Sequence, residues 1–258
     1  MLPNPRSCGA AEHAAKKVDA ALDNALHAPA PAMRNAIDRF LTELHAFAAP
    51  NVFNPWSSRD SRHDATTAAP EIRARQLKAY LLERLETARL LLVAEAAGYQ
   101  GAKFSGIAMT SERILLGHLA ARGIAPHAVL AIPAERSSGA AIKPQGFNEP
   151  TATVVWGTLL GAGVDSRAWV NWNAFACHPH RPGEPLSNRT PTRGELQAGQ
   201  AILRRFLDLF PRAAVVALGR HADHALDLLE VSHRAVRHPS MGGAARFRAE
   251  ILEIVGAL

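Results

Sequence analysis

Short, largely apolar runs that alternate with helix-like segments are the feature of this sequence that most limits its fold. The runs are residues 90–94, 168–175, 213–218 and the shorter 235–237. A short apolar run is typical of a strand buried on both faces, as in a parallel sheet. Because helical patterns lie between the runs, we predict a three-layer α/β/α fold, in which helices cover both faces of a central four-stranded, mostly parallel sheet.

Apolar residues at helical spacing predict the helices around this sheet. They occupy residues 34–47, 71–88, 111–122, 151–160, 193–210 and 220–231. The helix at residue 193 has the clearest beginning, because Thr192 and Glu195 have the spacing of a capping box. We predict one domain over residues 31–258, with an N-terminal helical extension, preceded by a tail over residues 1–30.

Loops beyond the carboxyl ends of the strands are where ligands bind in sheets of this type. The first such loop begins with Glu95, directly after the run at residues 90–94, and continues with small residues and glycines. Glycine lets the backbone approach a ligand closely, and Phe104 in the same loop offers a flat face. The alternative is an ordinary strand-to-helix turn with one solvated carboxylate.

The second loop follows the run at residues 168–175 and combines amide, hydroxyl and basic side chains. If side chains alternate along that strand, Asn171 and Asn173 point to one face, where an Asn amide offers a donor and acceptors to a planar amide or a base edge. A turn-forming Asn is the alternative. Residues 177–192 are basic and rich in proline, a composition suited to contacts with phosphates.

Cys177, His178 and His180 raise the question of a metal site in this loop. A zinc or iron–sulfur site needs further ligands at recognisable spacing, and the only other cysteine is Cys8, in the predicted tail. We therefore predict no metal, and instead a buried cysteine beside polar loop histidines.

The third loop begins with His238, Pro239 and Ser240 after the last short run, and two glycines follow Met241. A histidine N–H can stabilise an oxyanion that develops during a reaction. A lone histidine more often has a structural role, but the Pro-Ser pair and the glycines favour a functional loop.

The charge balance favours a polyanionic partner, though weakly. The chain has 29 Lys and Arg against 23 Asp and Glu, which gives a net charge of +6. Two cysteines suit a reducing compartment, and we find neither a secretory signal nor an apolar run of about 18 residues. We therefore expect a cytoplasmic monomer with no membrane association.

Taken in order, the three loops resemble motifs of the uracil-DNA glycosylase superfamily, above all of its iron–sulfur branch. The resemblance extends over residues 90–258. The matching segments are Ala94-Glu95-Ala96-Ala97-Gly98 for the water-activating motif, Asn173-Ala174-Phe175-Ala176-Cys177-His178-Pro179, Asn188-Arg189-Thr190-Pro191-Thr192 with Glu195, His238-Pro239-Ser240 for the His-Pro-Ser loop, and a weaker match at residues 217–222.

The chain departs from that pattern at several positions. The water-activating motif of the branch has glycine and proline where this chain has Ala94 and Ala97. The cysteines that would complete the family's cluster are missing, so we predict a divergent branch with no iron–sulfur cluster and no other cofactor. The first 85 residues or so match no motif of the family.

The resemblance implies an enzyme that flips uracil out of DNA and hydrolyses its N-glycosidic bond, leaving an abasic site. His238 then donates a hydrogen bond to the uracil O2 as negative charge develops there. Glu95 orients or activates the attacking water. The implied partners are uracil-containing DNA and abasic-site DNA.

Further residues follow from the same resemblance. Those implied to bind uracil are Ala96 through its backbone, Tyr99 by excluding the methyl group of thymine, Phe104 by stacking and Asn173 by its amide. Those implied to contact DNA are Ser187, Asn188, Arg189, Ser240, Met241 and Arg246, with Met241 as a wedge in the base stack.

Two alternatives stay open. The first is a protein that binds uracil or abasic DNA without turnover, which the changes at Ala94 and Ala97 allow; a retained Glu95 argues against it, because binding alone needs no carboxylate. The second is another α/β enzyme, such as an esterase-like or nucleoside hydrolase. The sequence has no G-x-S-x-G elbow, Walker loop or clear dinucleotide fingerprint, and it lacks the signature of a zinc deaminase.

Overall fold

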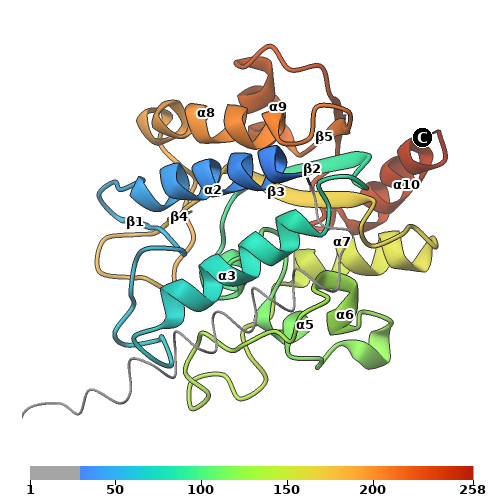
Figure 1. The fold of residues 1–258 in the computed structure, drawn as a ribbon. Helices are drawn as coiled ribbons and strands as arrows, with labels where there is room; N and C mark the ends of the chain where they lie inside the picture. Colours follow the sequence, from blue (N-terminus) through green and yellow to red (C-terminus); the bar gives the residue numbers. More distant parts are fainter. Residues whose placement is uncertain (1–29, 258) are drawn as a thin grey trace, which may run out of the picture.

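The computed structural model describes residues 30–257 and has the predicted α/β architecture (Figure 1). Its central sheet has the strand order β3-β2-β5-β6, and all three neighbouring pairs are parallel. The strands are β2 (Leu90–Ala96), β3 (Trp169–Phe175), β5 (Ala214–Leu218) and β6 (Arg234–Val236). The four strands predicted from apolar runs are therefore confirmed, as is a parallel sheet flanked by helices.

Helices lie on both sides of the sheet (Figure 1). On one side are α2 (Pro31–Ala46), α8 (Arg193–Asp208) and α9 (Arg220–Asp227); on the other are α7 (Pro150–Gly161) and α10 (Ala244–Val255). Short elements complete the fold, namely α4 (Ala102–Ser105), α5 (Glu112–Leu115), η1 (Ala120–Arg122), α6 (Pro126–Val129) and a small antiparallel sheet of β1 (Val52–Phe53) with β4 (His178–Pro179).

A buried aromatic cluster joins α2 and α8 to the sheet. The ring of Trp172 on β3 stacks on Phe206 of α8 at a centroid distance of 4.4 Å, and Phe40 of α2 lies 5.5 Å from the same ring. All three side chains are buried, and each such pair adds about 0.5–1.5 kcal/mol beyond the burial of its area. The helical extension that contains α2 is therefore part of the core.

The edge strand β3 is protected by α3 (Ala69–Leu82) and the turn after it. The hydroxyl of Tyr80 accepts a hydrogen bond from the backbone N–H of Asn171, and the guanidinium of Arg84 donates to the carbonyl of Trp169. These side chains satisfy edge groups that would otherwise be open to pairing with another chain.

Several predicted boundaries were wrong. Residues 111–122 form α5 and η1 instead of one helix, because Gly117 between them has a φ of +83°. The predicted loop at residues 238–248 ends early, since α10 begins at Ala244. The helices expected to reach residues 88 and 231 end at Leu82 and Asp227.

The capping box before α8 is confirmed, since Thr192 and Glu195 each accept the other's backbone N–H. Residues 1–29 of the predicted tail lie outside the described residues. Between residues 30 and 257, no helix is long and apolar enough to span a membrane.

Candidate functional site

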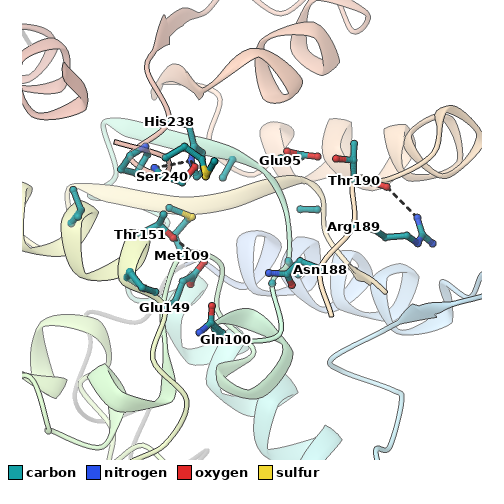
Figure 2. A pocket seen from close by; sticks show the side chains of 18 residues that line it. Glu95, Gln100, Met109, Glu149, Thr151, Asn188, Arg189, Thr190, His238 and Ser240 are labelled. Atoms are coloured by element: carbon teal, nitrogen blue, oxygen red, sulfur yellow. Dashed lines mark hydrogen bonds between the residues drawn. The ribbon is translucent and has the colours of Figure 1, made fainter. Parts of the chain in front are cut away.

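A cavity of about 820 Å³ opens beyond the carboxyl ends of β2 and β6 (Figure 2). The chain runs from β2 to β3 on one side and then crosses to β5 on the other, so the cavity lies beside the switch in strand order that positions ligands in sheets of this type. Its lining comes from the end of β2, the beginning of α7, the loop before α8 and the loop between β6 and α10. The labelled lining residues are Glu95, Gln100, Met109, Glu149, Thr151, Asn188, Arg189, Thr190, His238 and Ser240.

Glu95 and Ala96 end β2 and both line the cavity. The Glu95 side chain is 31% exposed, and its Oε2 lies 3.9 Å from Nε2 of His221 at the beginning of α9. Glu95 therefore keeps access to water while it faces the cavity. The backbone of Ala96 lies at the same rim, as the predicted contact with a base requires.

His238 lies across the cavity with a defined ring orientation. Its Nδ1 accepts the backbone N–H of Ser240 at 3.2 Å and lies 2.7 Å from the Ser240 hydroxyl. Because Nδ1 is an acceptor, the neutral ring carries its proton on Nε2. Burial, with repulsion from Arg237, lowers the pKa of His238 below its ordinary value, which favours this neutral form.

Two glycines make room for His238. A Cβ on Gly243 would lie 2.1 Å from the His238 carbonyl oxygen, and one on Gly219 would lie 2.9 Å from the His238 Cβ. In the loop that follows His238, Met241 has a φ of +52° and is 90% exposed. The loop therefore holds His238 at the cavity and presents Met241 to solvent, where the predicted wedge would be.

Arg246, which is also predicted to contact DNA, lies on α10 and not in a loop. It is exposed and pairs with Glu250, whose other oxygen accepts the backbone N–H of Arg237. Glu250 thus ties the beginning of the His238 loop to α10, and Arg246 borders that loop on the solvent side.

Asn188 connects the loop after Glu95 to the basic loop before α8. Its Oδ1 accepts the backbone N–H of Tyr99 at 3.1 Å, and it packs against Gly98. Asn188 also lines the cavity. Its side chain therefore fixes the relative position of two cavity walls.

Arg189 and Ser187, which are predicted to contact phosphates, form hydrogen bonds within the protein. Both terminal nitrogens of Arg189 donate to the Glu195 carboxylate, which lowers the pKa of Glu195, and Arg189 also donates to the carbonyls of His180 and Asn51. The hydroxyl of buried Ser187 accepts from the N–H of Arg181 and donates within the loop. These side chains shape the loop; contacts to phosphate through them stay a prediction.

Three predicted base-binding residues do not line the cavity. The ring of Phe104 is buried and stacks on Phe147 at 4.3 Å, and Tyr99 makes an edge contact with the same Phe147 ring. Asn173 is buried on β3 opposite Ala94, which does line the cavity. Within the described part of the chain, the Oδ1 of Asn173 has no hydrogen-bond partner.

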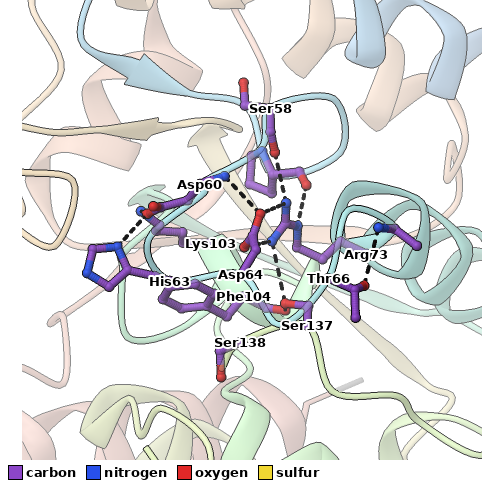
Figure 3. A network of polar contacts seen from close by, with 12 residues as sticks. Ser58, Asp60, His63, Asp64, Thr66, Arg73, Lys103, Phe104, Ser137 and Ser138 are labelled. Atoms are coloured by element: carbon purple, nitrogen blue, oxygen red, sulfur yellow. Dashed lines mark hydrogen bonds and ion pairs between the residues drawn. The ribbon is translucent and has the colours of Figure 1, made fainter. Parts of the chain in front are cut away.

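A buried polar network ties α4 to two loops (Figure 3). Nζ of Lys103 on α4 donates to Asp60 at 2.7 Å and to the carbonyl of Pro185 at 2.9 Å. Nearby, the guanidinium of Arg73 pairs with Asp64 and donates to the carbonyl of Ser58. The network joins the loop before α3, the Glu95 loop and the basic loop.

Cys177 and His178 are both buried at the start of the basic loop. Burial raises the pKa of the Cys177 thiol and lowers that of His178 to about 4. Nδ1 of His178 lies 2.9 Å from the carbonyl oxygen of Ala97, which holds the two loops together. Among residues 30–257, no three His, Cys, Asp or Glu side chains are grouped as a metal site would require.

Glu149 is a cavity residue that sequence reasoning missed. It directly precedes α7, its Oε1 accepts from the Thr151 hydroxyl at 3.3 Å, and its Oε2 is shielded from solvent. Glu149 lies at the beginning of a helix and not in a loop beyond a strand end, where ligands bind in sheets of this type. The Glu-Pro pair before an apolar helix was the available signal.

The comparisons with known proteins agree with this geometry. The family model for the uracil DNA glycosylase superfamily matches residues 83–254. A search of curated proteins finds no match. Among solved structures, the chain is similar to that of wild-type SMUG2 from Pedobacter heparinus, with a TM-score of 0.60 and 13% identity over 87% of this chain and 97% of that one. At that identity, the likeness to the solved structure shows the fold alone. The family model, in contrast, covers more than half of the sequence. The chain therefore belongs to the uracil DNA glycosylase superfamily.

Proposed function

We propose that this protein is a monofunctional glycosylase of DNA base-excision repair, which flips uracil out of DNA and hydrolyses its N-glycosidic bond. The observation that carries the proposal is the pair of groups across one cavity. Glu95 keeps a solvent-accessible carboxylate on one wall, and His238 holds an Nε2–H donor on another. A hydrolysis that expels a base anion needs these two functions together.

His238 is proposed to stabilise the leaving group. As the bond between the sugar C1′ and uracil N1 stretches, its electron pair moves into the base and negative charge gathers on O2. The Nε2–H of neutral His238 donates to that oxygen, and this interaction strengthens as the charge develops. The Ser240 N–H maintains the tautomer by donating to Nδ1.

Glu95 is proposed to act on water. The departing base leaves a cationic sugar, and the Glu95 carboxylate both favours that charge and orients a water molecule toward C1′. Water adds its oxygen to C1′ and releases a proton to the carboxylate, which completes an abasic site. The exposed fraction of Glu95 gives that water a route to the site.

The base is proposed to lie against the end of β2, beside the backbone of Ala96. The unpartnered Oδ1 of Asn173 suits the base's ring N–H. Phe104 is proposed to stack on the base, and Tyr99 to exclude a methyl group. The Phe147 ring covers Phe104 in this structure. Stacking on the base therefore requires the Phe147 ring to move when the base enters.

Contacts to DNA are proposed for both rims of the cavity. Exposed Met241 would fill the space that the flipped base leaves, and Arg246 lies near it. On the opposite rim, Ser187, Asn188 and Arg189 shape the loop that faces the phosphates, and Ser240 acts through His238. We further propose a monomer of a divergent branch that needs no cofactor.

A second candidate is a protein that binds uracil-containing or abasic DNA without turnover. The observation in its favour is that Ala94 and Ala97, which line the cavity, stand where the water-activating motif has glycine and proline. The presence of Glu95 favours hydrolysis over binding alone.

The two candidates are separated by incubating an oligonucleotide that contains one uracil with the protein and then with alkali, which breaks DNA at abasic sites. We expect strand breaks with the unmodified protein and a decrease of about 100-fold or more with Glu95→Ala or His238→Ala. A retarded band without breaks would support the binding protein.

A further inference from the structure

Glu149 lines the cavity, and one of its carboxyl oxygens is buried without a hydrogen-bond partner among residues 30–257. The residue lines the cavity at the beginning of α7, and its Oε2 packs against Gly101, where a Cβ would lie 2.0 Å away. The glycine thus allows the carboxyl group to sit at this wall, yet Oε2 has no partner among the described residues.

The hydrogen bond at Oε1 of Glu149 determines whether Oε2 acts as a donor or as an acceptor. The Thr151 hydroxyl donates to Oε1, so the neutral acid keeps Oε1 as its acceptor and carries its proton on Oε2. Burial raises the pKa of Glu149 to about 7, with the Thr151 hydrogen bond opposing the rise. A substantial fraction of the side chain is therefore neutral at physiological pH and has an O–H donor to offer.

We propose that Glu149 is a specificity-determining residue whose Oε2 donates a hydrogen bond to an exocyclic oxygen of the flipped base. The inference rests on the proposed function. A neutral donor at this position favours a base with a carbonyl group at that edge and opposes one with an amino group, since two donors would face each other. It therefore distinguishes deaminated bases from cytosine and adenine.

Asn173 complements this donor. Its buried Oδ1 is an unpartnered acceptor, which suits a ring N–H, while Glu149 suits the adjacent carbonyl. Ionisation of Glu149 removes the donor and turns Oε2 into a charged acceptor that repels the base's oxygen.

The charged and titratable groups on the neighbouring elements are Glu95 after β2, Lys103 on α4, Arg113 on α5, Arg189 in the basic loop and His238 after β6. The pKa of His238 is lowered, so its protonation affects activity at acid pH. A loss of activity above pH of about 7 is therefore assigned to Glu149.

The test compares Glu149→Gln and Glu149→Ala with the unmodified protein, with Glu86→Gln, an exposed position after α3, as the matched control. Uracil excision is followed by kcat/KM from pH 5.5 to 9. We expect the unmodified protein and Glu86→Gln to lose activity about tenfold per pH unit above roughly 7. Glu149→Gln keeps a neutral donor, so its activity should stay level from about pH 7 to 9.

Glu149→Ala should lose about tenfold or more in kcat/KM at pH 6, because one hydrogen bond to the base is removed. If Glu149→Gln shows the same alkaline loss as the unmodified protein, or Glu149→Ala keeps normal kcat/KM, the inference is overturned while the proposed function stands. If the unmodified protein neither releases nor binds uracil-containing DNA at any pH, the proposed function fails and the inference fails with it. Should Glu149→Ala not fold, the pH profile of Glu149→Gln decides alone.

Discussion

Replacement of Lys103 by methionine is predicted to destabilise the buried polar network that ties α4 to two loops. The Lys103 side chain is fully buried, its ammonium group pairs with Asp60 and with the Pro185 carbonyl, and it lies 4.5 Å from the centre of the Phe53 ring. Burial alone raises the pKa of Asp60, but the hydrogen bond and charge of Lys103 bring it below its ordinary value. Lys103→Met leaves that carboxylate buried without its main partner.

The expected decrease in the free energy of unfolding depends on the partners that Asp60 retains. Removing one member of a buried ion pair costs about 3–5 kcal/mol in the free energy of unfolding. Asp60 keeps His63 at 2.8 Å and the backbone N–H of Arg62, so we expect the lower end, about 3 kcal/mol. For a domain of this size that corresponds to a melting temperature about 6–12 °C lower.

Thermal unfolding followed by tryptophan fluorescence measures this change, because Trp56 and Trp172 are buried in the core. Lys143→Met, at an exposed position, is the control and should change the free energy of unfolding by less than about 0.5 kcal/mol. Adding Asp60→Asn to Lys103→Met should recover part of the loss. A melting temperature for Lys103→Met equal to that of the control would refute the reasoning.

Three further predictions concern the loop that carries His238. Excision should decline as the pH falls through a midpoint below 6.5, because protonation of Nδ1 turns the acceptor of the Ser240 N–H into a donor; a rate independent of acid pH would contradict this. Met241→Ala should slow excision from duplex DNA about tenfold and leave single strands unaffected, whereas equal rates on duplex would exclude a wedge. Gly243→Ala should reduce excision about 100-fold, because its Cβ would lie 2.1 Å from the His238 carbonyl oxygen, while Gly161→Ala, with open space around it, should not.

The sequence predicted the central sheet and three of the loops that line the cavity, namely those of Glu95, Arg189 and His238. Apolar runs identify strands that are buried on both faces, and the carboxyl ends of parallel strands meet at one edge. The sequence therefore predicts that Glu95 and His238 lie at the same edge of the sheet. Both line the cavity in the structure.

Other features depend on packing between distant segments, which local patterns do not contain. Phe104 is covered by Phe147, which lies 43 positions later in the chain. Composition identified Arg189 as a basic loop residue, but not that Glu195 holds its guanidinium. The buried oxygen of Glu149 likewise results from the approach of α7 to Gly101. Periodicity describes one element at a time, whereas these contacts join two or more.

We propose that this cavity breaks the bond between uracil and deoxyribose with the help of His238. The most direct measurement is the release of free uracil from DNA, quantified by mass spectrometry under single-turnover conditions with enzyme in excess. We predict release by the unmodified protein, and release slowed by about 100-fold or more in His238→Ala. No free uracil from the unmodified protein, or equal rates for both proteins, would contradict the account.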